Sequence, residues 1–154
     1  MLFLSLHQKK MIELKQIQTN DLIPIRHAVL RKGMPVESCH FQEDNLSTTI
    51  HFGAYVDKKI VGCATVIKNR NSNFDTENQF QLRGMAILDG FQKQGLGEKI
   101  FRFCEQKFTV PNTVLWFNAR QNAVPFYQKL NCKTQGNAFM IEPIGLHYLM
   151  YKHY

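Results

Sequence analysis

The sequence predicts an α+β fold, in which helices flank a single mixed β-sheet. Two observations favour this class. Strand-like runs follow one another directly in the middle of the chain and again at its end, whereas a doubly wound fold would alternate strands and helices throughout. The length of 154 residues also suits one domain with a sizeable core. We expect that domain to span residues 11–154, after a loose N-terminal extension over residues 1–10.

Strands are expected where short runs rich in β-branched and aromatic residues lie between turn signals. These runs occupy residues 12–16, 50–56, 60–68, 79–88, 114–118, 133–141 and 146–152. The turn Asp57-Lys58-Lys59 joins the second run to the third and indicates a hairpin. The last two runs are expected to form a terminal antiparallel pair.

Helices are expected between the groups of strands. Asn20 or Asp21 is expected to cap the first helix, which has Pro24 in its first turn and ends at Gly33. A polar connector with one short helix follows over residues 35–45. The next long helix is amphipathic, with one apolar stripe made by Leu96, Ile100, Phe101, Phe103, Cys104 and Phe108.

The start of the amphipathic helix carries a glycine-bearing loop, Gln92-Lys93-Gln94-Gly95-Leu96-Gly97. Neither Gly95 nor Gly97 has a Cβ, so backbone N–H groups there can approach a phosphate closely. The helix start adds unpaired N–H donors and the positive end of the helix dipole. The sequence therefore predicts an anion site, and the alternative is a solvated turn before a core helix.

Two other phosphate-binding loops do not fit this pattern. A Walker P-loop ends in Gly-Lys-Ser/Thr, whereas Glu98 and Lys99 follow Gly97. A dinucleotide-binding loop needs a third glycine, and Ile100 occupies that position. The loop is therefore expected to serve a different phosphate ligand.

Two segments after the loop connect it to a family. Residues 114–118 predict a buried strand, and residues 118–130 read Asn-Ala-Arg-Gln-Asn-Ala-Val-Pro-Phe-Tyr-Gln-Lys-Leu. In this order the loop, the strand and the following helix resemble the GNAT superfamily of acetyl-coenzyme A-dependent acyltransferases. The end of the chain resembles the last strand of that family, although Leu146 stands where proline is common. The resemblance covers about residues 11–152.

The resemblance implies a GNAT-like mixed, mainly antiparallel sheet of about six or seven strands, in which the fourth and fifth strands splay apart. It also implies transfer of an acetyl group from acetyl-coenzyme A to a primary amine by direct attack. Tyr127 matches the family tyrosine that protonates the departing thiolate. The alternative is that Phe126 and Tyr127 only pack a helix onto the sheet. A non-catalytic coenzyme A-binding sensor or interaction module of the same fold is the other candidate function.

The residues expected to bind coenzyme A lie in the fourth strand, in the loop and around the fifth strand. They are Met85, Ala86, Ile87, Gln92, Lys93, Gln94, Gly95, Leu96, Gly97, Glu98, Asn118, Ala123, Phe126 and Tyr127. The strand backbone would hold the pantetheine arm and polarise the thioester carbonyl, and the loop would hold the pyrophosphate. For Asn118, hydrogen bonding to local backbone is an equal alternative. No metal is expected.

The amine acceptor is expected near Arg83, Glu142 and His147. Strand alternation would place Arg83 on the same face as Met85. There it would pair with a substrate carboxylate or phosphate, or else face outward from the sheet. Many relatives have a glutamate base near this position, so the proton acceptor stays open among Glu142, His147, His51 and bound water.

Composition limits the expected partners. The net charge is +7, but the basic residues are scattered, which disfavours a nucleic-acid surface and suits an anionic ligand such as coenzyme A. No 18-residue apolar span is present for a membrane helix. Cys63 and Cys104 fall in apolar elements and no C-x-x-C pair occurs, which indicates a reducing, cytoplasmic setting. We expect a small-molecule or peptide amine substrate, no nucleic-acid or membrane partner, and a monomer or homodimer.

Overall fold

The computed structural model describes residues 8–108 and 110–154, and within them it confirms one mixed sheet of seven strands. The strands are β1 (Ile12–Ile17), β2 (Ile50–Val56), β3 (Lys59–Lys68), β4 (Asn78–Ile87), β5 (Thr113–Arg120), β6 (Lys133–Ile141) and β7 (Gly145–His153). Their order in the sheet is β1-β2-β3-β4-β5-β7-β6, and only the β4–β5 pair is parallel. Most of the expected N-terminal extension, residues 1–7, lies outside the described residues.

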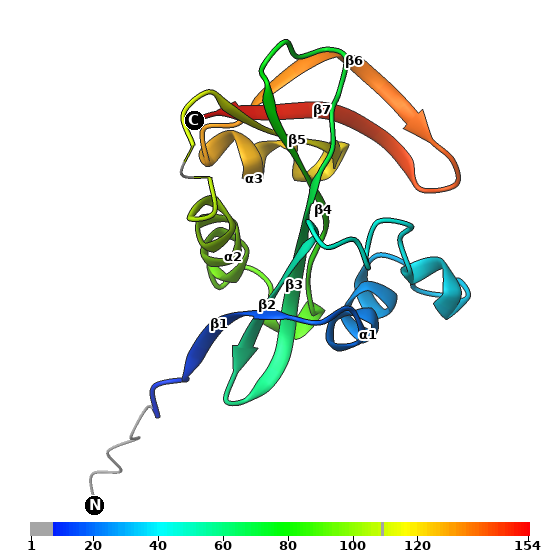
Figure 1. The fold of residues 1–154 in the computed structure, drawn as a ribbon. Coiled ribbons are helices and arrows are strands. Elements are labelled where there is room, and N and C mark those ends of the chain that lie inside the picture. Colours follow the sequence, from blue (N-terminus) through cyan, green and yellow to red (C-terminus); the bar gives the residue numbers. More distant parts are fainter. Residues whose placement is uncertain (1–7, 109) are drawn as a thin grey trace, which may run out of the picture.

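Helices cover both faces of the sheet. They are α1 (Thr19–Val29), α2 (Leu96–Glu105) and α3 (Val124–Lys129), with short 3-10 helices η1 (Val36–Cys39), η2 (Asp89–Phe91) and η3 (Gln121–Ala123). Helix α1 lies on one face, and α2 and α3 lie on the other (Figure 1). Each face of the sheet has its own hydrophobic core. Successive residues of β3 point into different cores, since Cys63 packs with α1 whereas Ala64 packs with α2 and α3.

The apolar stripe predicted for α2 is confirmed. Leu96, Ile100, Phe101 and Cys104 are buried, and Phe103 and Phe108 are partly buried against the same core. The turn at Asp57 and Lys58 is also present, and both residues adopt the left-handed conformation that a two-residue hairpin turn requires.

The start of α1 differs from the prediction. Strand β1 stays paired with β2 as far as Ile17, so the chain turns at Gln18 and the helix begins directly after it. Asp21 is therefore not the cap residue but lies in the first turn, where its Oδ2 accepts a hydrogen bond of 3.0 Å from the Gln18 N–H. Pro24 falls in the second turn, and the helix ends at Val29, before Gly33.

Strands β4 and β5 part after a short parallel contact. Their pairing runs only from Asn78 to Gln81 on β4 and from Thr113 to Trp116 on β5. Beyond these residues the two strands diverge, which confirms the splayed centre of the sheet. The divergence leaves the second halves of both strands free to line a common opening.

A bulge in β4 changes which residues share a face. Cys63 pairs with Ala86 and Thr65 pairs with Arg83, so β4 contains one extra residue at Gly84, which has a φ of +59°. As a result Met85 packs with the α2 side of the sheet, whereas the guanidinium of Arg83 lies over Phe41 on the α1 side. The expectation that alternation puts Arg83 on the same face as Met85 is therefore wrong.

Candidate active site

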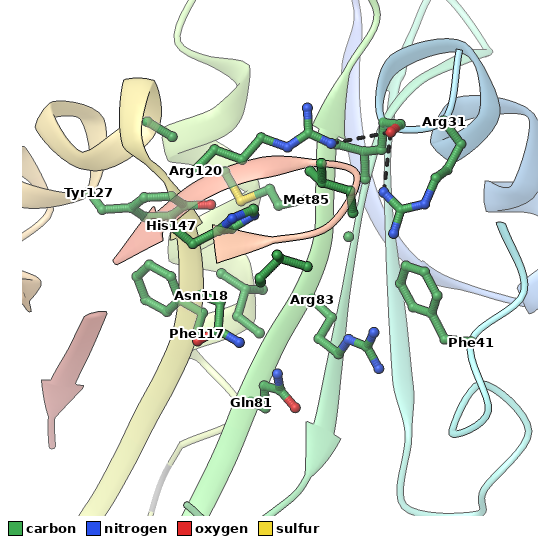
Figure 2. Close-up of a pocket in the computed structure, with 17 residues that line it drawn as sticks. Arg31, Phe41, Gln81, Arg83, Met85, Phe117, Asn118, Arg120, Tyr127 and His147 are labelled. Carbon is green, nitrogen blue, oxygen red and sulfur yellow. Dashed lines mark hydrogen bonds between the residues drawn. The ribbon is translucent and has the colours of Figure 1, made fainter. Parts of the chain in front are cut away.

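A cavity of about 250 Å³ lies where β4 and β5 diverge. Its walls come from the second halves of both strands, the chain just after α1, the start of α3 and the turn between β6 and β7 (Figure 2). The polar and charged side chains that line it are Arg31, Gln81, Arg83, Asn118, Arg120, Tyr127 and His147. The cavity therefore joins segments that lie far apart in the sequence.

Six of the seventeen expected site residues line this cavity, and the expected loop residues 92–98 lie instead around the start of α2. Those that line it are Arg83, Met85, Asn118, Ala123, Tyr127 and His147. Ala86 is buried in the core under α1, and Ile87 is partly buried beyond the cavity. Glu142 is exposed at the β6–β7 turn and does not line the cavity.

Tyr127 enters the cavity from helix α3. Its ring packs against Phe117, with ring centroids 4.4 Å apart, and against Phe126 at 5.0 Å. The side chain is 9% exposed, and its hydroxyl points toward the cavity (Figure 2). Within the described chain this hydroxyl has no hydrogen-bond partner. Burial raises the pKa of Tyr127 well above its ordinary value, so the hydroxyl keeps its proton at neutral pH.

The glycine-bearing loop is anchored to the end of β4. The side-chain amide of Gln92 donates a hydrogen bond of 2.9 Å to the carbonyl oxygen of Ile87. Lys93 and Gly95 both have positive φ angles, and Gly95 is the N-cap of α2. The N–H of Lys99 bonds to the Gly95 carbonyl at 3.1 Å, which leaves the N–H groups of the three preceding helix residues without a partner inside the helix.

Gly97 allows α2 to pack closely on α3. A Cβ at this position would lie 3.1 Å from Phe126 Cζ and 3.5 Å from Met85 Cε. Met85 also lines the cavity, so one side chain connects the helix start with the site. The absence of a Cβ at Gly97 therefore has a packing reason, in addition to the access to phosphate expected from the sequence.

His147 lies on β7, buried at the cavity wall. Its Nδ1 lies 2.7 Å from the carbonyl oxygen of Gly145, and its ring packs against Phe139 with centroids 6.2 Å apart. A carbonyl oxygen only accepts hydrogen bonds, so Nδ1 carries the hydrogen in the neutral ring and Nε2 keeps its lone pair. His147 is therefore able to accept a proton at Nε2.

His51, the other candidate histidine, is held away from the cavity. Its Nδ1 lies 2.8 Å from Thr65 Oγ1, and its Nε2 lies 2.9 Å from the Asp44 carbonyl oxygen. Both ring nitrogens have partners in the fold, and the residue does not line the cavity. This arrangement indicates a structural role for His51.

A buried ion pair supports the α1 side of the cavity. Arg26 is fully buried and donates hydrogen bonds of 2.7 and 2.9 Å to the two carboxylate oxygens of Asp44. It donates two more, each of 2.8 Å, to the Cys39 carbonyl and the Thr65 hydroxyl. Phe41, which lines the cavity, lies over this guanidinium with 3.8 Å between Cζ and the ring centroid. The pair therefore ties η1 and the following loop to the sheet.

The sequence pattern did not indicate Arg31 or Arg120 as site residues, although both stand inside segments that carry the GNAT resemblance. Arg31 Nη1 and Arg120 Nη2 each lie 3.2 Å from the carbonyl oxygen of Leu30 (Figure 2). Arg83 Nη1 forms an ion pair of 2.9 Å with Glu43. Burial is the main cause that lowers the pKa values of Arg31 and Arg83 from their ordinary value.

Residues 8–108 and 110–154 hold no group of three or more His, Cys, Asp or Glu side chains placed to bind a metal ion. Over the same ranges, no helix combines the length and the apolar character needed to cross a membrane.

Known proteins resemble this chain in both sequence and structure. A family model for the acetyltransferase (GNAT) domain matches residues 28–146. The uncharacterized N-acetyltransferase YitI of Bacillus subtilis (strain 168) is 32% identical over 143 residues, which are 92% of this chain and 96% of the relative. The chain therefore belongs to the GNAT acetyltransferase family, and its class is that of acetyl-coenzyme A-dependent acyltransferases.

Solved structures share the fold at low sequence identity. The loading GNATL domain of CurA from Lyngbya majuscula has a TM-score of 0.72 and 14% identity, over 93% of this chain and 98% of that one. An aminoglycoside 6'-N-acetyltransferase complexed with coenzyme A has a TM-score of 0.70 and 12% identity, over 91% of this chain and 96% of that one. These similarities confirm the GNAT-like fold.

Proposed function

We propose that the protein transfers an acetyl group from acetyl-coenzyme A to a primary amine by direct attack, with Tyr127 as the general acid. The observation that carries this proposal is the free, protonated hydroxyl of Tyr127 in the cavity between the splayed strands. The acceptor is a small molecule or a peptide, and the setting is cytoplasmic, which suits four buried cysteines without disulfides.

The residues around the cavity fit acetyl-coenzyme A. Residues 92–98 offer unpaired N–H groups and a helix N-terminus to the pyrophosphate, with Lys93 at the rim of the loop. Met85 lies between this helix start and the cavity, and strand β4 no longer pairs with β5 at this level. The free backbone groups of β4 would hold the pantetheine arm and polarise the thioester carbonyl. Asn118 is placed to bond the pantetheine or the amine. The cofactor itself supplies the activated acetyl thioester.

The acceptor nitrogen loses two protons in this mechanism, one before the attack and one as the amide forms, and the leaving thiolate gains one. His147 Nε2 accepts a proton from the ammonium form of the acceptor, directly or through water, which frees the nitrogen lone pair. A bond then forms between that nitrogen and the acetyl carbon, while the carbon–sulfur bond breaks. Tyr127 gives its proton to the departing thiolate. The second proton, which the nitrogen loses as it becomes an amide, returns through water to the Tyr127 oxygen and restores the hydroxyl.

Replacing Tyr127 with phenylalanine tests the proposal. The ring keeps its packing against Phe117, and no protein group loses a partner, since the hydroxyl is free within the described chain. We expect turnover to fall by about 10²–10⁴-fold, with little change in coenzyme A affinity measured by calorimetry or in melting temperature. The matched control is Tyr55→Phe on β2, a residue that does not line the cavity.

Two results would contradict the proposal. Unchanged turnover in Tyr127→Phe, measured with chemistry rate-limiting, would reduce Tyr127 to a packing residue. Tight binding of coenzyme A without acetylation of any amine, in a screen across small amines, amino sugars, amino acids and peptides, would instead indicate a non-catalytic coenzyme A-binding module.

A further inference from the structure

Two guanidinium groups meet at the cavity wall from distant parts of the chain. Arg31 follows helix α1 and Arg120 ends strand β5, and both donate to the carbonyl oxygen of Leu30 (Figure 2). In the described part of the chain neither forms an ion pair. Two like charges therefore converge on one neutral acceptor.

A structural role alone does not account for both arginines. One basic side chain is enough to satisfy a carbonyl near a helix C-terminus. Each guanidinium has five N–H donors in a rigid fork, and in the described chain each donates one hydrogen bond, to Leu30. Arg31 also lies over the Phe41 ring, with 5.9 Å between Cζ and the centroid, which uses none of its N–H donors. The remaining donors are free to bind a planar or tetrahedral oxyanion.

The surroundings of the pair are also positive. No aspartate or glutamate lines the cavity, whereas Arg83 contributes a third guanidinium to its wall. Glu43 pairs with Arg83 at 2.9 Å, and Asp44 is fully engaged by Arg26 behind the wall. The charges of Arg31 and Arg120 thus have no counter-charge within the described cavity lining.

We propose that the acceptor amine also carries an oxyanion group, a carboxylate or a phosphate, which Arg31 and Arg120 bind. The inference rests on the proposed acetyltransferase activity and names the class of its acceptor. A cavity of about 250 Å³ favours a small molecule, with its amine toward His147 and Tyr127 and its anionic end at the two arginines. Binding the anionic end fixes the amine relative to the thioester.

A panel of matched amines tests this assignment. Glycine, β-alanine and 4-aminobutyrate are each compared with their carboxamides, which have the same shape without the charge, and O-phosphoethanolamine is compared with ethanolamine. We expect kcat/KM to favour the anionic member of at least one pair by on the order of 10- to 100-fold. The carboxylate and phosphate arms distinguish the two oxyanions.

Variants of the arginines link the preference to the site. Arg31→Gln and Arg120→Gln keep a donor for the Leu30 carbonyl. Each is expected to lower kcat/KM far more for the anionic member of a pair than for its neutral partner, and so to abolish the preference. Arg120→Lys, which keeps the charge but not the fork, is expected to restore part of it. The control is Arg70→Gln, an exposed residue of the β3–β4 loop that bonds the Glu77 carbonyl.

Thermal shifts provide a readout that does not depend on turnover. With coenzyme A present, an anionic panel member should raise the melting temperature of the wild type more than its neutral partner does, and Arg31→Gln should remove the difference. Equal turnover of anionic and neutral amines would overturn the inference but leave the proposed acetyltransferase intact. The inference would also be overturned if no panel member showed either a turnover preference for the anionic form or a larger anion-dependent rise in melting temperature.

Discussion

The Asp44→Asn substitution would leave a fully buried guanidinium without its counter-charge. Arg26 is 0% exposed and holds both carboxylate oxygens of Asp44 at 2.7 and 2.9 Å. The Phe41 N–H also donates to Oδ2, at 2.8 Å. An asparagine NH₂ group at the Oδ2 position would be a donor facing the Phe41 N–H and the Arg26 guanidinium, which are donors too, so these hydrogen bonds would be lost. Removing one partner of such a buried pair costs about 3–5 kcal/mol of the free energy of unfolding.

We expect a loss near the middle of that range, about 4 kcal/mol, because Arg26 keeps its bonds to Cys39 and Thr65. For a domain of this size, this loss lowers the melting temperature by about 8–16 °C. Denaturant titration and calorimetry measure both quantities. Glu43→Gln provides the matched control, since it removes the half-exposed ion pair with Arg83, worth at most about 1 kcal/mol.

The pH dependence adds a second test. Burial alone would raise the pKa of Asp44, but the hydrogen bonds from Arg26 and the Phe41 amide outweigh it and lower that pKa below its ordinary value of 3.8. The stabilisation is therefore complete above the unfolded-state pKa and is lost as the pH falls through the lower folded-state pKa. The stability difference between wild type and Asp44→Asn should narrow in acid. A loss no larger than that of Glu43→Gln at pH 7 would refute the reasoning.

Two further predictions concern the proton acceptor and the thiols. His147→Ala should lower kcat while coenzyme A affinity is retained. A variant that is only less stable, with kinetics like those of the exposed control His153→Ala, would make His147 structural. Burial raises the pKa of Cys63 to about 12, and those of Cys104 and Cys132 also rise. At pH 8 about one Cys63 thiol in ten thousand is then ionised, so an aromatic disulfide reagent should label the protein only after unfolding. Rapid labelling of the native protein would contradict this.

The sheet and helix α2 could be predicted because their signals are local. A period of two or of 3.6 residues identifies a strand or an amphipathic helix without knowledge of its neighbours. The bulge at Gly84 was not predictable in this way, since it follows from the pairing of β4 with β3. The same limit explains the first helix, whose start is set by the pairing of Ile17 with His51.

The site residues also differ in whether a local sequence signal could identify them. Motifs indicated Tyr127 and His147 as candidate site residues, and both line the cavity, while their roles stay predictions. The convergence of Arg31 and Arg120 could not be predicted, because it joins residues about 90 positions apart through the Leu30 carbonyl. Glu142 stands close to His147 in the sequence, yet it is exposed, because the turn between β6 and β7 carries it away from the cavity lining.

Gly84 explains how one strand serves both sides of the site. Gly84 is the extra residue of the bulge and has a positive φ. Because of this bulge, Met85 lies on the α2 side of the sheet and Arg83 lies on the α1 side. A Cβ at this position would lie 3.1 Å from both Arg26 Nε and the Phe41 ring, so a larger residue would strain the backbone and press on the buried ion pair at once. Strand β4 therefore presents an apolar side chain to the core under α2 and a cation to Phe41 and Glu43 within three residues. Under the proposed function, this single bulge separates Met85, which is expected beside the cofactor, from Arg83, which is expected beside the acceptor.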